Sequence, residues 1–157
     1  MTSLELKVQG NIKSVVTYLK EIAEANGIKY YLYGGVELGI SKATGDPNYA
    51  YPLLWMEQPT CKFLMNPGGL WTLKYYMGVN VLTSVSGHLD DEIDASDECQ
   101  KILGNIIKKL YKDLREAKFI TLSKDFEMDE IDRNWANNHV GWRASFEIEF
   151  QAKAIKS

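Results

Sequence analysis

The chain has 157 residues, of which 45% are hydrophobic and 25% are charged, the ordinary balance of a globular protein. This length predicts one domain over residues 1–157, with a core large enough to fold without disulfides or a structural metal. The chain has 18 Lys and Arg residues and 21 Asp and Glu residues, and these give a net charge of −3. Proteins that bind duplex DNA depend on positive charge to neutralise phosphates, so this balance argues against sequence-specific nucleic-acid binding.

The sequence predicts neither a membrane protein nor a secreted one. No run approaches the roughly 18 apolar residues of a membrane-spanning helix. The stretch MTSLELKVQGNIKSVV at the start of the chain lacks the basic residues, apolar run and cleavage site of a signal peptide, so we expect none. Cys61 and Cys99 stand far apart in the sequence and are expected to be reduced thiols in a cytosolic product.

The first strong pattern predicts an amphipathic helix over residues 11–26. Asn11 is suited to cap the start of this helix, because its side chain can accept an unpaired backbone N–H. Gly27 is suited to end it in a left-handed conformation, with Ile28 packing back on the last turn. The apolar face is expected to consist of Ile12, Val15, Val16, Leu19, Ile22 and Ala23.

A short β-prone segment and a long connection follow this helix. Residues 29–33 (KYYLY) predict a strand that two glycines stop. Residues 34–50 have no regular period and predict an irregular connection, and connections of this length in a compact domain are often functional.

Three strands are predicted next, over residues 51–57, 61–66 and 70–84. The sequence Asn66-Pro67-Gly68-Gly69 between the second and third is typical of a turn, so these two strands should form a hairpin. In the third strand apolar residues alternate with mixed ones, which predicts one face on a core. Gly78 in this strand indicates a bulge or a bend.

An acidic stretch at residues 88–98 (HLDDEIDASDE) leads into a second amphipathic helix, expected over residues 95–117. Asp94 or Ser96 is expected to cap its start. Acids near the start and Lys and Arg residues toward the end complement the helix macrodipole, so this charge pattern needs no bound ligand.

Two more strands are predicted after this helix, with a polar loop between them. The first covers residues 119–126, and the loop covers residues 127–139 around Trp135. The final strand, over residues 142–153, alternates strictly between apolar and polar residues, which predicts one face on a core and the other in water or on a polar partner. Its apolar side is expected to consist of Trp142, Ala144, Phe146, Ile148, Phe150 and Ala152.

Taken together, these elements predict an α+β fold. An antiparallel β-sheet carries two amphipathic helices packed on one face, and a β-hairpin projects from it. The two apolar helix stripes match the single apolar face of the sheet.

The sequence holds no pattern that is typical of an active site. His88 and His139 lie in polar segments with no nucleophile placed beside them, so no Ser/His/Asp or Cys/His centre is predicted. The acids that follow His88 lack the spacing of an EF-hand loop, and a helix start explains them better. No phosphate-binding glycine motif occurs. We therefore expect no catalytic residue, no cofactor and no metal site.

Two alternatives to a non-catalytic structural protein stay open. One is a small metal-dependent nuclease, in which Glu147 and Glu149, which share one strand face, would take part. The other is a cytosolic protein-binding module.

Aromatic residues make up 11% of the chain, and most fall on predicted strand faces, where they would pack in the core. Trp135, in a polar loop, and the hairpin at residues 59–71 do not. Aromatic and apolar side chains on such segments are frequent anchors of protein interfaces. The residues expected to contact another subunit or partner are Phe63, Leu64, Met65, Trp71 and Trp135.

Three stretches carry a resemblance to a known family. They are residues 51–57 (YPLLWME) after an amphipathic first helix, the acidic entry to the second helix, and residues 138–142 (NHVGW) opening the last strand. With the order of the elements over about residues 10–154, they resemble the tail-terminator and tail-completion proteins of tailed bacteriophages. The connection at residues 34–50 and the hairpin at residues 58–70 depart from the shortest members of that family.

The resemblance implies a structural virion protein that forms a homo-oligomeric ring, hexameric or dodecameric, in the phage neck or upper tail. Its implied partners are copies of itself and other neck, tail or portal proteins, with DNA passing through the ring and no membrane involved. Such a subunit would assemble in the cytoplasm of the bacterial host. It would have no catalytic activity.

Overall fold

The fold is built around two long strands whose sequences alternate between apolar and polar residues. β4 (Trp71–Ser84) and β7 (His139–Gln151) pair antiparallel, without a break, from Thr72 opposite Gln151 to Ser84 opposite His139. Every second residue of each strand faces the core, as the alternation predicts. The expected apolar face of the last strand is confirmed for the part of that strand that the structure describes.

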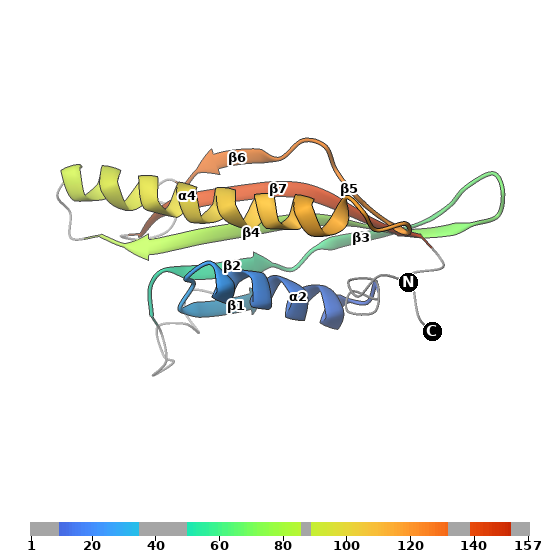
Figure 1. Ribbon diagram of the computed structural model, residues 1–157, viewed down its shortest axis with the longest axis horizontal. Helices are drawn as coiled ribbons and strands as arrows, with labels where there is room; N and C mark the ends of the chain where they lie inside the picture. Colours follow the sequence, from blue (N-terminus) through green and yellow to red (C-terminus); the bar gives the residue numbers. More distant parts are fainter. Residues whose placement is uncertain (1–9, 35–49, 86–88, 132–138, 152–157) are drawn as a thin grey trace.

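The computed structural model describes residues 10–34, 50–85, 89–131 and 139–151, and within them it holds two helices and a seven-stranded sheet (Figure 1). This is an α+β fold. The helices are α2 (Ile12–Ala25) and α4 (Leu89–Leu114). Besides β4 and β7, the strands are β1 (Tyr30–Gly34), β2 (Leu53–Glu57), β3 (Thr60–Met65), β5 (Ile120–Leu122) and β6 (Glu127–Glu130).

Shorter strands flank the central pair on both sides. β2 and β3 each pair antiparallel with a different half of β4, while β5 and β6 each pair antiparallel with a different half of β7. β1 pairs with β2 in parallel, so the sheet is mixed and the expectation of a wholly antiparallel sheet is wrong at this one pairing. The chain leaves β1 and re-enters β2 in the same direction, which the long connection between them allows.

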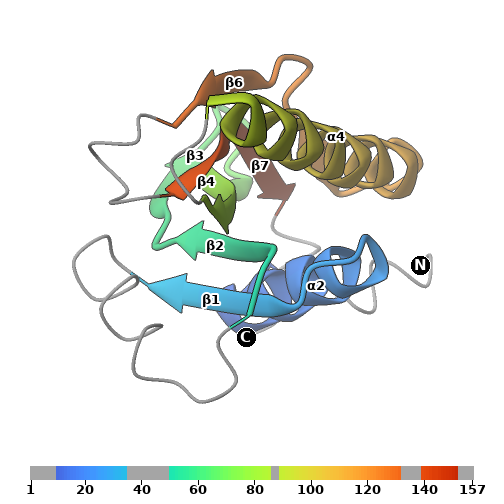
Figure 2. The same ribbon diagram turned by 90° about the vertical axis from the view of Figure 1, so that its left-hand side faces the viewer.

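Both helices cover the same face of the sheet, here called the helix face (Figure 2). One buried cluster joins the apolar stripes of α2 and α4 to alternate residues of β2, β4 and β7. The opposite face, here called the far face, carries a second, smaller buried cluster at β2, formed by Leu53, Trp55, Leu82 and Ile131. In the described residues, no helix is both long enough and apolar enough to cross a membrane.

The ends of α2 are formed by the residues that the sequence indicates. The side-chain oxygen of Asn11 accepts a hydrogen bond of 2.9 Å from the backbone N–H of Ser14. Gly27 takes a φ of 87°, and the backbone N–H of Ile28 then donates to the carbonyl of Ala23 at 3.1 Å. Ile28 is buried, so the helix stop also contributes to the core.

The start of α4 differs from the prediction. This helix begins at Leu89 instead of residue 95, so neither Asp94 nor Ser96 caps it. Ser96 is buried, and its hydroxyl donates to a carboxylate oxygen of Glu130 at 2.7 Å. The indole N–H of Trp142 donates to the carbonyl of Ser96 at 3.1 Å. Ser96 therefore joins α4 to β6 and β7, and the acidic run forms the first turns of the helix.

The segment after α4 also differs from the prediction. The strand expected over residues 119–126 is limited to β5, and the start of the expected loop at residues 127–139 is the strand β6. Only Met128 of β6 is apolar, so its residues show almost no strand pattern. Pairing with the backbone of β7 stabilises it instead. The predicted connection at residues 34–50 lies outside the described residues except at its two ends. Trp135 lies outside them altogether.

Two strand glycines make room for neighbouring groups. The register of β4 passes through Gly78 without a bulge, which corrects that expectation. Gly141 lies opposite Leu82, and a Cβ at this position would overlap the carbonyl oxygen of Val81 and come within 2.9 Å of its carbonyl carbon. The close approach of the β4 backbone thus explains the glycine at this position.

We predict that Gly141→Ala destabilises the protein by about 1–3 kcal/mol, because the β4 backbone cannot move aside. Gly104→Ala is the control, since nothing lies within 4 Å of the position that its Cβ would take. Urea unfolding of both variants would measure the difference. Equal effects would contradict this explanation of Gly141.

We also predict that Phe146→Ala lowers the free energy of unfolding by about 3–5 kcal/mol. Phe146 is buried on the helix face and its ring stacks on Phe126, with centroids 4.6 Å apart. The same substitution at Phe63, whose exposed fraction is 59%, is the control and should change the free energy by less than about 0.5 kcal/mol. Similar losses at both positions would show that the assigned facing of β7 is wrong.

Candidate functional site

Two surfaces of the molecule have the character of a functional site. The first is the apolar surface of the β3–β4 hairpin, here called the hairpin surface, and the second is a polar hollow on the far face. The exposed fractions of the hairpin-surface side chains are 59% for Phe63, 41% for Leu64, 61% for Met65, 55% for Leu70 and 44% for Trp71.

The tip of the hairpin is a hydrogen-bonded turn. The backbone N–H of Asn66 donates to the carbonyl of Leu70 at 2.9 Å, and the Asn66 side-chain oxygen accepts from the backbone N–H of Leu70 at 2.9 Å. Gly69 takes a φ of 80°, which favours glycine at this position. The turn predicted from the NPGG sequence therefore holds the two apolar strand ends together.

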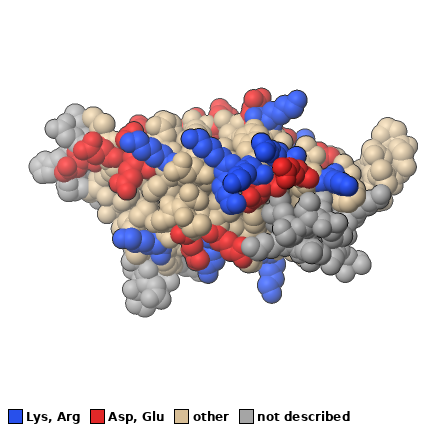
Figure 3. All heavy atoms as spheres, in the orientation of Figure 1, with Lys and Arg blue, Asp and Glu red and all other residues tan. Residues whose placement is uncertain are grey.

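The hairpin projects from one end of the sheet (Figure 1). Thr72 lies opposite Gln151, the last described residue of β7, so the tip extends past the described part of the neighbouring strand. All six residues of β3 are exposed. In Figure 3 the same end of the molecule shows few charged side chains, while Lys, Arg, Asp and Glu gather over the helices.

Apolar side chains lie on both sides of the hairpin. The register places Phe63 opposite Leu73 and Met65 opposite Trp71, all on the helix side, whereas Leu64 lies opposite Thr72 on the far side. The rings of Phe63 and Trp71 are 4.8 Å apart and tilted by 49°. A groove of about 400 Å³ beside the tip continues this surface from Leu64 and Leu70 to Phe119 on the body of the protein.

Four of the five predicted contact residues therefore lie together on one projecting element. Phe63, Leu64, Met65 and Trp71 are all exposed there, and their role in binding stays a prediction. Trp135 lies outside the described residues. Leu70 belongs to the same surface, and its place beside Trp71 at the end of the turn was the signal that could have indicated it.

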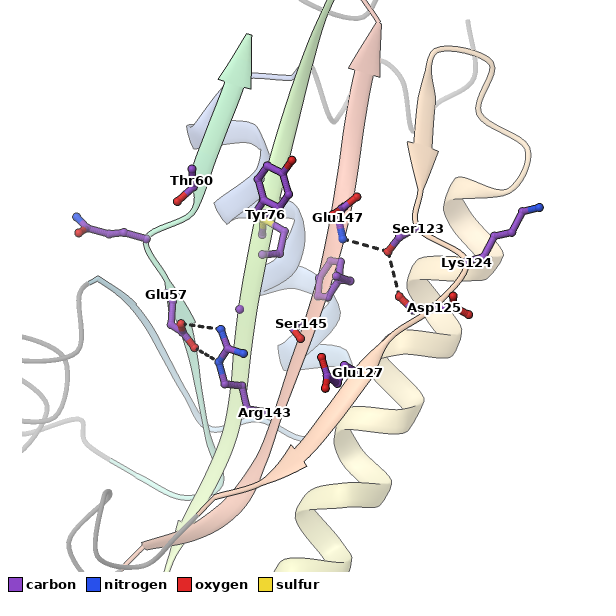
Figure 4. A pocket seen from close by; sticks show the side chains of 14 residues that line it. Glu57, Thr60, Tyr76, Ser123, Lys124, Asp125, Glu127, Arg143, Ser145 and Glu147 are labelled. Carbon is purple, nitrogen blue, oxygen red and sulfur yellow. Dashed lines mark hydrogen bonds and ion pairs between the residues drawn. The ribbon is translucent and has the colours of Figure 1, made fainter. Parts of the chain in front are cut away.

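The polar hollow crosses the middle of the far face and has a volume of about 630 Å³ (Figure 4). On one side it is lined by the segment that joins β2 to β3, and on the other by the segment that joins β5 to β6. Carboxylates outnumber cations around it: Glu57, Asp125, Glu127 and Glu147 line it together with Lys124 and Arg143.

Glu57 and Arg143 form an ion pair across β4 at the edge of this hollow (Figure 4). Arg143 donates from Nε to one carboxylate oxygen of Glu57 at 2.7 Å and from Nη2 to the other at 3.1 Å. Asn80 adds a hydrogen bond of 2.8 Å from its side-chain nitrogen. Gly78 lies between the partners, and its lack of a side chain leaves the space that the pair fills.

The environment of Glu57 favours its charged form. Burial alone would raise the pKa of Glu57, but the hydrogen bonds from Arg143 and Asn80 and the charge of Arg143 outweigh this effect and hold the pKa below its usual range. The same pairing raises the pKa of Arg143. The pair is thus a fixed structural link between β2 and β7.

The residues of the nuclease alternative are placed on the far face. The carboxylate of Glu147 forms an ion pair with Lys74, with 3.1 Å between Oε2 and Nζ. Glu149 lies opposite Lys74 in the register of β7 with β4. Within the described part of the chain, no three His, Cys, Asp or Glu side chains are grouped so that they could hold a metal ion.

The described histidine and the two cysteines lie on three different elements. His139 is buried at the start of β7, where its Nε2 lies 2.7 Å from the hydroxyl of Tyr51, and His88 is outside the described residues. Cys99 is buried in the core, and burial raises the pKa of its thiol to about 12. Cys61 is exposed on β3.

Comparison with known proteins gives no family assignment. No family model matches the chain, and no curated protein is significantly similar to it in sequence. Function is therefore inferred from the surfaces described above and from the resemblance in element order and local sequence.

We predict that Glu57→Gln changes how stability depends on pH. A carboxylate whose pKa falls on folding stabilises the protein above its unfolded pKa of about 4.3, and this contribution is lost as the pH falls toward the folded pKa. The wild type should therefore be more stable than Glu57→Gln at neutral pH, and the difference should shrink below about pH 4.3.

Urea unfolding at a series of pH values would measure this effect. Glu24→Gln is the matched control, because Glu24 forms an exposed ion pair with Lys20 at 4.0 Å, and such pairs contribute little. Parallel pH curves for the wild type and Glu57→Gln would contradict the assigned role of the pair.

Proposed function

We propose that this chain is a structural virion protein of a tailed bacteriophage, a ring-forming subunit of the neck or upper tail. The observation that carries the proposal is the hairpin surface, where five large apolar side chains are exposed together on one projecting hairpin. The resemblance to tail-terminator and tail-completion proteins supplies the class. In this proposal the subunit meets copies of itself and other neck, tail or portal proteins, and DNA passes through the ring.

The exposure of the hairpin in a single copy gives a physical reason to expect a partner. A two-stranded ribbon is marginally stable in water, and the described part of β7 pairs with β4 only as far as Thr72, short of the turn. Contiguous exposed apolar side chains of this kind mark protein interfaces. Phe63 and Trp71, which contact each other, are residues of the type that anchor such interfaces.

The position of the hairpin supports a ring over a symmetric dimer. It projects from one end of an elongated molecule, whereas the acidic start of α4 lies at the other end (Figure 1). A contact between two different patches is heterologous, and repeated around a closed rotation it generates a ring. The net charge of −3 on each copy does not prevent this, because positive and negative side chains are interspersed over the surface (Figure 3).

We predict that the wild type forms rings and that the double variant Phe63→Ser/Met65→Ser weakens their assembly by at least about tenfold, as the loss of interface anchors does. Light scattering after size-exclusion chromatography would give the mass, and negative-stain microscopy would show the rings. Unfolding of the double variant should stay close to that of the wild type, since both side chains are exposed.

Ile12→Ser, which replaces an exposed aliphatic residue on α2, is the control and should assemble normally. A wild type that is strictly monomeric at high concentration would overturn the proposed function.

A further inference from the structure

We propose that copies of this chain join edge to edge, with β3 of one copy pairing with β6 of the next so that the sheet continues from subunit to subunit. This inference rests on the proposed function, because it requires that copies assemble. It adds which strands meet and which side chains select the partner.

The first support is that both strands have an available edge. β3 pairs with β4 and β6 pairs with β7, and neither pairs with any other strand in the described part of the chain. An exposed strand edge presents unpaired N–H and C=O groups that a further strand can bond. All six residues of β3 and three of the four in β6 are exposed, so neither strand is covered by its own fold.

The second support is position. β3 lies on the β4 side of the central pair and β6 on the β7 side, so they form opposite edges of the sheet. They also lie toward opposite ends, since β3 pairs with the first half of β4 and β6 with the first half of the antiparallel β7 (Figure 1). Two different edges joined in this way make a heterologous contact, and such a contact generates a ring when the rotation from copy to copy closes.

The third support is charge on the far face. The register places Lys62 of β3 opposite Lys74 on this face, and two lysines directly opposite each other repel. Both ammonium groups lie over the ring of Tyr76, at 5.3 and 5.7 Å from its centroid. Lys74 has Glu147 as its ion-pair partner, whereas Lys62 has no ion pair with any residue that the structure describes.

β6 supplies the complementary charge on the same face. Glu127 lies opposite Ser145 and Asp129 lies opposite Arg143, so both acids are on the far face of their own sheet. In a continuous sheet they come beside Lys62 of the neighbour. Opposite charges on neighbouring strands stabilise the pairing, and this contact would offset the repulsion between Lys62 and Lys74.

The helix face is complementary in another way. Phe63 and Met65 of β3 lie on this side, and so does Met128 of β6, which is half-buried. Glu130 of β6 also lies on the helix side, opposite Trp142, and its carboxylate accepts a hydrogen bond from Ser96 of its own subunit at 2.7 Å. Met128 is therefore the β6 side chain that would meet Phe63 or Met65 on the helix side, while opposite charges meet on the far side.

The test is a charge swap read out as assembly mass by light scattering. Lys62→Glu and Glu127→Lys, each alone, should weaken assembly by at least about tenfold, because like charges then meet at the interface. The double variant Lys62→Glu/Glu127→Lys should regain it. An equimolar mixture of the two single variants should also assemble, since alternating copies restore opposite charges at every contact.

Two controls separate this effect from damage to the fold. Lys13→Glu makes the same charge change on α2 and should assemble as the wild type does. Lys62→Glu removes a like-charge pair within the monomer, so its free energy of unfolding, measured in urea, should not fall.

The outcomes distinguish the two proposals. If the wild type assembles and both single variants assemble equally well, or if neither the double variant nor the mixture regains assembly, the β3–β6 pairing is overturned while the proposed function stands. If the wild type is monomeric, the proposed function fails and this inference fails with it.

Discussion

The antiparallel pairing of β4 with β7 is the interaction on which the rest of the structure depends. Its unbroken register gives the sheet one continuous apolar face, and both helices pack on that face. Every other strand except β1 pairs directly with one of these two strands. The hairpin turn lies beyond the described part of β7, and the polar hollow lies between the pairs of shorter strands that flank β4 and β7. The two surfaces with functional character are thus consequences of the lengths of two strands.

Several elements could be predicted from the sequence because their signals are local. The cap at Asn11, the stop at Gly27 and the turn after Asn66 each depend on the conformational preference of a few adjacent residues. The facing of β7 depends on strict alternation over a long run. The exposed hairpin residues could also be predicted, because an apolar pair of strands joined by a tight turn has little room to bury both of its sides.

Other features depend on partners far away in the sequence. β6 is polar, and it forms a strand by pairing with the backbone of β7. Ser96 is a buried helix residue whose hydrogen-bond partners are Glu130 and Trp142. The Glu57–Arg143 pair joins residues 86 positions apart. Gly78 was the one local sign of that pair, since a glycine inside a strand indicates either a bulge or the close approach of another group. The parallel pairing of β1 with β2 had no local sign.

The central position of β7 has a consequence for how the chain folds. β7 is the last of the described strands in the sequence, yet it contributes one half of the central pair and one partner of the Glu57–Arg143 link. During synthesis β4 and both helices leave the ribosome before the strand that completes their sheet. Until then the apolar face of β4 lacks a neighbour on one side, and the unpaired edge is open to other chains. Contacts of such long sequence separation slow folding, so the newly made chain passes through a period in which aggregation competes with the closing of the sheet.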